Sequence, residues 1–283
     1  MNPSSAPAMR RQRGMSLVEM MIAMTIGLVI TIVIANLFVG TKQTYRTQDD
    51  LSRIQENTRF AFQVVGRLTR QAGYRADWNR TIDLVFNALS PIDGTNATGF
   101  NSSDTLIVRF QGSGLGTSSA GCLTTNSCGG ADGRILDCLG NRVDRLMGAL
   151  PSPYVATLNV TYVENWLRVR SGGANGNPAL FCSLDQGNTW TEIVPDIENM
   201  QIVYGEKTGP IAVDRYLPAG TAGLSMSQVL NLRVAVLHRS PNLSAGAKDT
   251  RTYDLAGTTV GPYNDERIRL ATNSNFVLRN RTQ

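Results

Sequence analysis

Glu19 is the residue whose type and setting most demand a chemical explanation. It stands in an apolar stretch that begins after Gly14, and no other charge follows it from Met20 to Thr41. A carboxylate inside such a stretch costs free energy unless it has a partner or a role. Glu19 is therefore expected either to lie beside the cytoplasmic lipid headgroups or to form half of an ion pair.

The cysteines and the single histidine are the next residues that could carry chemistry. Cys122, Cys128, Cys138 and Cys182 all follow the apolar stretch, and an even number beyond a membrane segment predicts two disulfides in an oxidising compartment. No C-x-x-C pair is present, so a metal site is not expected. His238 has no second histidine beside it and is expected to be an ordinary surface or edge residue.

The remaining motifs favour structure over catalysis. The stretch Ser183–Trp190 reads S-x-D-x-G-x-T-W and resembles the Asp-box of sialidases, a hairpin turn that is not catalytic. Asp93 and Asp104 flank a polar loop, but the D-x-D-x-D spacing of a calcium loop is missing. With one histidine and no G-x-S-x-G motif, the chain is predicted to be no enzyme and to need no cofactor.

The element that must position Glu19 is a membrane helix. The uncharged run after it is about 20 residues long, enough to span a bilayer. Arg10, Arg11 and Arg13 precede it, which predicts a cytoplasmic N-terminus. The competing interpretation, a secretory signal peptide, needs an A-x-A cleavage pattern after the run, and none is present.

A second, amphipathic half of the helix is predicted after Gly40. No proline occurs from Thr41 to Ala72, and Gly73 is a plausible residue to end the helix. One apolar face is formed by residues spaced three, four or seven apart, and the charged residues between them, Asp50 among them, form a solvated face. The apolar residues are Leu51, Ile54, Ala61, Phe62, Val65, Leu68 and Ala72. The two halves together predict one helix from about Ser16 to Ala72.

Short β-rich runs between turn signals follow. They are Thr105–Phe110, Arg134–Cys138, Tyr154–Val163, Trp166–Arg170, Ala179–Cys182, Trp190–Val194, Met200–Tyr204, Val229–Leu237, Arg267–Ala271 and Asn275–Arg279. The alternation in Val229–Leu237 marks a half-buried strand. The predicted fold is α+β, a long N-terminal helix packed on an antiparallel β-sheet domain. The Gly/Ser-rich segment 111–133 matches no pattern with an assigned role.

The charge of the chain argues against a nucleic-acid partner. The formal net charge is +5, and the three arginines before Gly14 account for three of these charges, which leaves +2. A nearly neutral domain has no electrostatic footprint for nucleic acid.

The junction Arg13-Gly14-Met15-Ser16-Leu17-Val18-Glu19 resembles the class III signal of type IV pilins and pseudopilins. The resemblance implies that prepilin peptidase cuts between Gly14 and Met15 and methylates the new N-terminus at Met15. It also implies that Glu19 pairs with the N-terminal amine of a neighbouring subunit during assembly. Gly27 and Gly40 are either close-packing sites or simply tolerated.

Further segments resemble PilW-type minor pilins. They are Glu56–Ala61, Gln71–Tyr74, Asp137–Gly140, Ala179–Cys182, Ile197–Gly205 and Val277–Arg281. This resemblance implies a type IV pilin-like fold and a disulfide between Cys138 and Cys182, which leaves Cys122 to pair with Cys128.

The predicted organisation is a prepilin leader (1–14), a transmembrane and assembly half-helix (15–41), an amphipathic half-helix (42–73) and a periplasmic β-rich domain (74–283). The resemblance implies a minor pilin of the inner membrane that enters or primes a type IV pilus, with roles in twitching motility and adhesion. Its implied partners are prepilin peptidase, other minor and major pilins, the inner-membrane assembly platform and, before assembly, membrane lipid. The alternatives are a type II secretion pseudopilin, a membrane-anchored periplasmic binding or enzymatic domain, and a DNA-uptake pilin.

Overall fold

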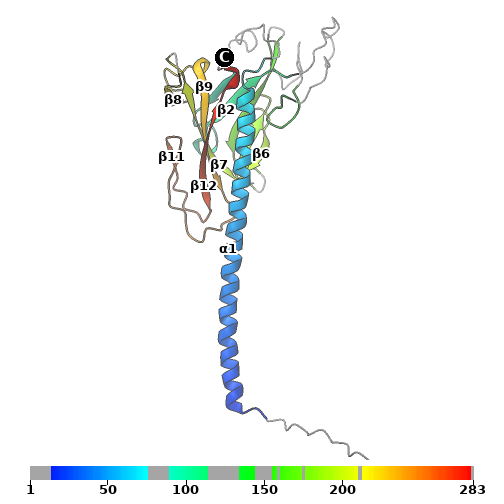
Figure 1. Cartoon of the computed structure of the whole chain (residues 1–283), viewed down its shortest axis with the longest axis vertical. Coiled ribbons are helices and arrows are strands. Elements are labelled where there is room, and N and C mark those ends of the chain that lie inside the picture. The colour runs from blue at the N-terminus through cyan, green and yellow to red at the C-terminus, as the bar shows by residue number, and fades with distance from the viewer. Residues whose placement is uncertain are drawn as a thin grey trace, which may run out of the picture. The chain divides into compact units, whose positions relative to one another are not determined.

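The structure is a computed structural model that describes residues 14–75, 89–113, 134–143, 155–157, 160–173, 176–209 and 212–281. The chain divides into two compact units, Met1–Gln48 and Asp49–Gln283. One helix, α1 (Leu17–Gln71, 55 residues), contributes to both (Figure 1). The predicted helix from Ser16 to Ala72 is therefore confirmed to within one residue at each end.

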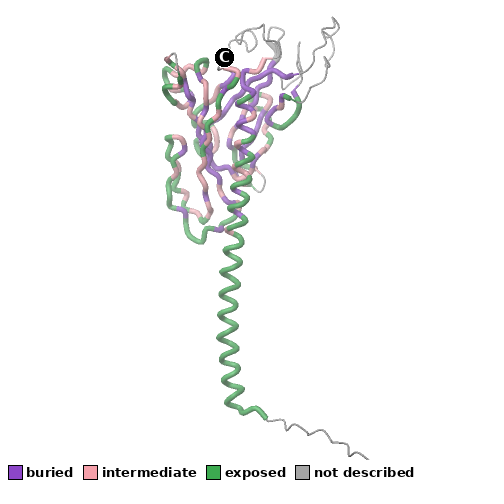
Figure 2. The backbone as a smooth tube through the Cα atoms, viewed as in Figure 1, coloured by how far each residue is buried: buried purple, intermediate pink, exposed green. Residues whose placement is uncertain are grey.

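In the first unit, the residues of α1 from Leu17 to Arg46 are exposed on every face of the helix, as the exposed colour in Figure 2 shows. The helix contains an 18-residue window with a mean hydropathy of 2.5, long and apolar enough to cross a membrane. In water such a surface is unfavourable, because apolar area is not removed from solvent.

In the second unit, α1 buries one face. Ile54, Ala61, Val65 and Leu68 are at most 1% exposed, in agreement with the predicted apolar stripe. The prediction is wrong at the start of this stripe, where Leu51 is 37% exposed and Asp50 is 2% exposed. Asp50 tolerates burial because its carboxylate accepts hydrogen bonds from the Ser244 hydroxyl and the Asn242 amide.

The C-terminal end of α1 is closed by backbone and side-chain hydrogen bonds. Gly73 follows with φ of +73°, the left-handed conformation expected of a residue after a helix, and its N–H donates to the carbonyl of Arg109. The Asn280 amide, from the other end of the chain, donates to the carbonyl of Ala72 at 3.0 Å. These contacts satisfy groups that the last helical turn leaves without partners.

In the described residues after α1, here called the β-domain, the strands form two larger sheets and one hairpin, and all the strand pairs that they form are antiparallel. The first has the order β1-β2-β4-β5-β6, with β3 paired to β4, and the second has the order β12-β9-β7-β8. The first contains β1 (Ile92–Thr95), β2 (Thr105–Phe110), β3 (Val155–Thr157), β4 (Val160–Arg170), β5 (Ala179–Ser183) and β6 (Thr191–Pro195). The second contains β7 (Ile197–Glu206), β8 (Arg215–Pro218), β9 (Val229–Arg239) and β12 (Arg269–Val277), and β10 (Tyr253–Leu255) and β11 (Thr258–Val260) form a separate hairpin. The predicted α+β class is confirmed.

Several strand predictions are wrong. The predicted run Trp166–Arg170 is not a separate strand but the second half of β4, whose first residues lie in the predicted run Tyr154–Val163 together with the separate strand β3. The runs Arg267–Ala271 and Asn275–Arg279 belong to one strand, β12, because the polar residues between them pair with β9 in continuous register. The polarity of these intervening residues had predicted a loop between two strands. A strand, however, needs only backbone pairing and one apolar face. Arg134–Cys138 is not a strand and forms only an isolated bridge, between Leu136 and Arg142.

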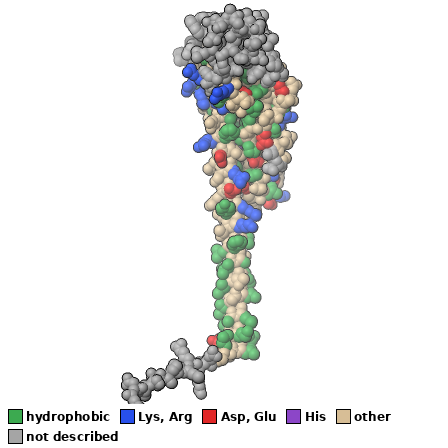
Figure 3. Space-filling model, turned by 90° about the vertical axis from the view of Figure 1, so that its right-hand side faces the viewer, with side chains coloured by type: hydrophobic (Ala, Val, Ile, Leu, Met, Phe, Trp, Pro, Cys, Tyr) green, Lys and Arg blue, Asp and Glu red, His purple; other side chains and the backbone are tan. Residues whose placement is uncertain are grey.

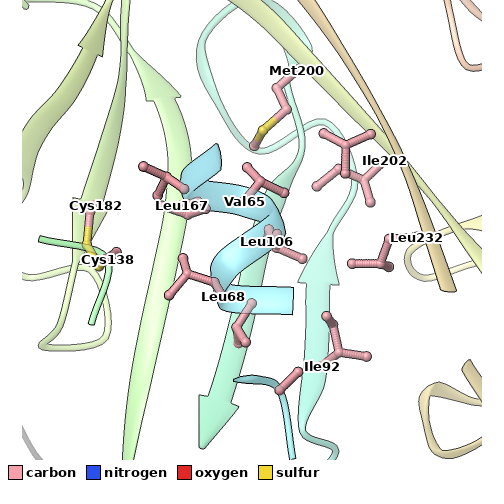
Figure 4. Packing of buried hydrophobic residues seen from close by; sticks show 14 of the residues in the cluster. Val65, Leu68, Ile92, Leu106, Cys138, Leu167, Cys182, Met200, Ile202 and Leu232 are labelled. Carbon is pink, nitrogen blue, oxygen red and sulfur yellow. A yellow bond between two sulfur atoms is a disulfide. The ribbon is translucent and has the colours of Figure 1, made fainter. Parts of the chain in front are cut away.

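One apolar cluster joins α1 to both sheets. Val65 and Leu68 of α1 lie among Leu106 and Leu167 of the first sheet and Leu232 of the second, as Figure 4 shows (Figure 4). The amphipathic part of α1 is therefore the third wall of the core, since each sheet and the helix bury an apolar face against the others.

Candidate processing and assembly site

Gly14, Met15 and Ser16 form a short exposed segment directly before α1. Apart from the chain neighbours of Gly14, no atom of the described residues lies within 4 Å of the position that a Cβ on Gly14 would occupy. The first helical hydrogen bond in the described residues accepts at Ser16, two residues after Gly14, where the Met20 N–H donates to the Ser16 carbonyl at 3.1 Å. A protease needs an accessible, extended peptide, and the Gly14–Met15 bond lies in the part of the junction that is not yet helical. Arg10, Arg11 and Arg13 lie outside the described residues.

Glu19 lies in the first turn of α1 and is exposed. A carboxylate there is favourable because the helix dipole places partial positive charge at the N-terminal end. Within the described residues Glu19 makes no ion pair or hydrogen bond. Its carboxylate is therefore available to a cation from another molecule.

The residues after Glu19, up to Gly40, form an exposed and mostly apolar surface that contains three uncharged polar side chains. Met20, Ile26, Val33 and Phe38 expose 51%, 54%, 53% and 70% of their area, respectively. Figure 3 shows apolar side chains along this part of the helix (Figure 3). A contiguous apolar surface of this extent marks a contact with lipid or with other helices.

In the β-domain, a disulfide joins Cys138 to Cys182, the pair that the family resemblance implied. Cys182 lies in β5, and Cys138 lies in the segment 134–143, whose Asp137 carbonyl accepts a hydrogen bond from Arg67 of α1 at 2.8 Å. The disulfide and this contact together hold the segment against the sheet and the helix end. Cys122 and Cys128 lie outside the described residues.

His238 is not the surface or edge histidine that was expected. It is 1% exposed in β9, whose neighbours β7 and β12 pair with it on both sides. Neither ring nitrogen has a hydrogen-bond partner among the residues that the structure describes, and burial lowers the pKa of His238 to about 4. Among the described residues no group of three or more histidine, cysteine or acidic side chains could hold a metal.

The turn Ser183–Trp190 is built as its motif suggested. The Gly187 N–H donates to the Ser183 hydroxyl, the Thr189 N–H donates to the Asp185 carboxylate at 2.9 Å, and Gly187 has φ of +90°. Hydrogen bonds from Thr189 are the main cause that lowers the pKa of Asp185 to about 2. The carboxylate is thus committed to holding the turn.

Asp93 and Asp104 are also used by the fold. Asp104 is buried and accepts hydrogen bonds from the N–H groups of Ala97 and Ile202, at 2.9 and 2.7 Å. Asp93 lies 3.6 Å from the Arg109 guanidinium. Both carboxylates therefore have structural partners.

Asp50 is the polar contact of α1 that the sequence pattern missed. The only hint of this contact in the sequence is the pair Asp49-Asp50 at the start of the amphipathic stripe. Asp49 faces solvent, whereas Asp50 faces the protein. A pattern of apolar residues alone does not distinguish between them, because a buried carboxylate depends on donors that are distant in sequence.

Two regions of this chain are similar to known protein families. The family model described as Type IV Pilus-assembly protein W matches residues 154–280, and the model described as Prokaryotic N-terminal methylation motif matches residues 9–35. No curated protein matches. Among solved structures, a type IV-like pilin from Thermus thermophilus is similar, with 14% sequence identity and a TM-score of 0.39, over 83% of this chain and 97% of that one.

Proposed function

Since this chain is a PilW-like type IV pilin with an N-terminal methylation motif, we propose that it is a minor pilin that enters or primes a type IV pilus, in support of twitching motility and adhesion. Before assembly, the prepilin is inserted in the inner membrane with its N-terminus in the cytoplasm and its β-domain in the periplasm. Prepilin peptidase removes residues 1–14 and methylates Met15. The inner-membrane assembly platform then moves the apolar part of α1 from lipid into contact with other pilins.

One observation carries this proposal. An exposed Gly14–Met15 bond directly precedes a helix whose stretch Met20–Thr41 is exposed and uncharged, and the one charge of α1 before that stretch is Glu19, four residues after Met15. A permanent membrane anchor needs the apolar length but has no use for a carboxylate within it, since that carboxylate costs insertion free energy.

Glu19 has a specific role in this proposal. Once residues 1–14 are removed, each subunit has a positive amine at Met15, and the Glu19 carboxylate of a neighbour neutralises it. The pair forms among apolar side chains, where electrostatic attraction is stronger than in water. Because the apolar helix surface passes from lipid to other helices that are about as apolar, the ion pair contributes register and direction to the assembly.

The decisive measurement is the mass of the mature N-terminus, because it tests cleavage and methylation together. We expect a chain that begins at Met15 and carries one added methyl group. The variant Gly14→Ile keeps the leader because a branched side chain does not fit the site that accepts glycine, and surface pili and twitching are lost. Gly27→Ala is the matched control, since it also fills open space beside α1 but leaves the junction intact.

Two outcomes contradict the proposal. An intact Met1 on the mature protein supports a membrane-anchored periplasmic domain instead. Normal surface pili and twitching in the Gly14→Ile strain exclude a role that depends on processing.

A further inference from the structure

Asn36 differs from the other polar residues in the apolar part of α1. From Met20 to Gly40 the polar side chains are Thr25, Thr31 and Asn36. The Thr25 hydroxyl donates to the Ile22 carbonyl and the Thr31 hydroxyl donates to the Gly27 carbonyl, both at 2.8 Å. Asn36, by contrast, makes no hydrogen bond within the described residues. Its amide has two N–H donors and one carbonyl acceptor, so it needs a partner outside its own helix.

Water does not supply this hydrogen-bond partner at the position of Asn36 in the membrane. Side chains on a helix tilt toward its N-terminus. With the N-terminus in the cytoplasm, as in the proposed function on which this inference rests, the Asn36 amide points toward the middle of the bilayer and away from the periplasmic surface. An amide in hydrocarbon without a hydrogen bond is unfavourable, and lipid tails offer it neither donor nor acceptor.

The face around Asn36 is shaped for close approach. Gly40 lies four residues further on the same side, and nothing lies within 4 Å of the position of a Cβ there. A hollow runs along this face and is lined by Val33, Asn36, Leu37, Gly40, Thr41 and Thr44. The hydroxyls of Thr41 and Thr44 donate to carbonyls of their own helix, so Asn36 is the one side chain in the hollow whose polar atoms still need partners.

We propose that a second copy of this chain occupies this face while the protein is stored in the membrane. Two copies inserted with the same topology are parallel, and therefore place their Asn36 side chains at the same depth. Each amide both donates and accepts, so two of them are complementary to each other. The missing side chain at Gly40 lets the two backbones approach closely enough for this pair to form. The dimer is held at Asn36 and Gly40, on a surface that assembly later requires for other contacts.

Self-association in lipid tests this inference. The mature chain, Met15–Gln283, is labelled with donor or acceptor fluorophore at its C-terminus and placed in phosphatidylethanolamine–phosphatidylglycerol vesicles. Energy transfer is then measured against the protein-to-lipid ratio. We expect Asn36→Leu to weaken association by about 3- to 10-fold, the range typical of an interhelical hydrogen bond in a membrane, and Gly40→Leu to weaken it as well. Thr31→Val is the matched control, because its hydroxyl is satisfied within the helix, and it should leave association unchanged.

Equal association of the Asn36→Leu variant and the unchanged protein overturns the inference. So does a chain that is inserted but monomeric, including one that associates only with the helix of a different pilin. The mature N-terminal mass separates this failure from failure of the proposed function. A cleaved, methylated and inserted chain that stays monomeric contradicts only the self-association, whereas an uncleaved chain contradicts the proposed function itself.

Discussion

At the scale of single residues, the second unit buries several polar and charged side chains, most of which have hydrogen-bond or ion-pair partners. The Arg269 guanidinium is buried and lies 2.6 Å from Glu198 and 2.5 Å from Asp265, and Arg109 lies 2.5 Å from Glu164. Asp50 accepts hydrogen bonds from neutral donors, and the His238 side chain makes no hydrogen bond to any described residue. These four arrangements respond differently to substitution and to pH, because only some involve charges that compensate each other.

Replacing Asp50 by alanine is expected to destabilise the domain by about 1–3 kcal/mol. The change removes a buried acceptor that binds the Ser244 hydroxyl and the Asn242 amide, and so loosens the start of the docked part of α1. Asp49→Ala is the matched control, since that exposed carboxylate only pairs with Arg53 in the next turn, and it should change the free energy of unfolding by less than about 0.5 kcal/mol. Urea unfolding followed by circular dichroism measures the free energy of unfolding of both variants. Equal effects of the two substitutions would contradict a structural role of the buried carboxylate.

His238 should make the domain sensitive to acid. Burial depresses its pKa from 6.5 to about 4, so the folded protein keeps the ring neutral while the unfolded chain binds a proton below pH 6.5. Stability is therefore lost as the pH falls from about 6.5 to about 4, by about 3 kcal/mol in total. The difference in unfolding free energy between the unchanged protein and His238→Leu, measured at pH 7.5, 5.5 and 4, isolates this contribution. A difference that does not vary with pH contradicts it.

At the scale of elements, α1 packs closely against β12. A Cβ on Gly66 would lie 2.8 Å from Cε1 of Phe276, and the Phe276 ring lies 6.1 Å from the Phe62 ring. A larger residue here would force the Phe276 ring to shift, which favours glycine at this point even though glycine is unfavourable within a helix. Strand β12 thus determines the distance at which α1 lies against the second sheet.

Gly66→Val is expected to destabilise the domain by about 1–3 kcal/mol, because the new side chain overlaps Phe276 and the helix or the strand must move. Combining it with Phe276→Ala should recover part of that loss, so the effects of the two substitutions should not add. Gly27→Val serves as the control, since that glycine faces open space. Thermal unfolding of the four proteins completes the cycle, and strict additivity would show that the two residues do not interact.

At the scale of the whole molecule, the two units differ in where their apolar side chains lie: the first unit exposes them and the second buries them in a core. Every residue described as buried lies at Asp50 or beyond, and the part of α1 in the first unit contributes none. The apolar core of the β-domain and its disulfide are thus complete without residues 1–48. The first unit needs a membrane or other helices, whereas the second unit needs neither.

The fragment Asp49–Gln283 should therefore fold alone and stay soluble without detergent. We expect it to unfold in a single transition at a temperature within a few degrees of the β-domain of the full chain in detergent micelles. Size-exclusion chromatography and calorimetry provide the measurements. An aggregated or unfolded fragment would show that the first unit contributes to the stability of the second.

The sequence alone determined the features that depend on local pattern. Charge and hydropathy along the chain were sufficient to predict the apolar helix and the position of Glu19 within it, because insertion into a membrane depends on contiguous sequence. The cleavage junction at Gly14–Met15 stays a prediction that rests on the resemblance to type IV pilins. The α+β class and most strands followed from alternation and turn signals, and the whole amphipathic half-helix from its apolar spacing.

The tertiary structure alone decided which polar residues are buried and which strands continue. Asp50 and His238 were assigned to the surface because their types favour water, yet each is covered by elements far from it in sequence. Strand β12 is continuous because the polar residues at its centre pair with β9. A glycine is favoured at position 66 because the Phe276 ring packs against α1 there. The physical reason is common to all of them: burial, pairing and close approach are properties of two segments brought together, and the pattern of one segment contains only half of that information.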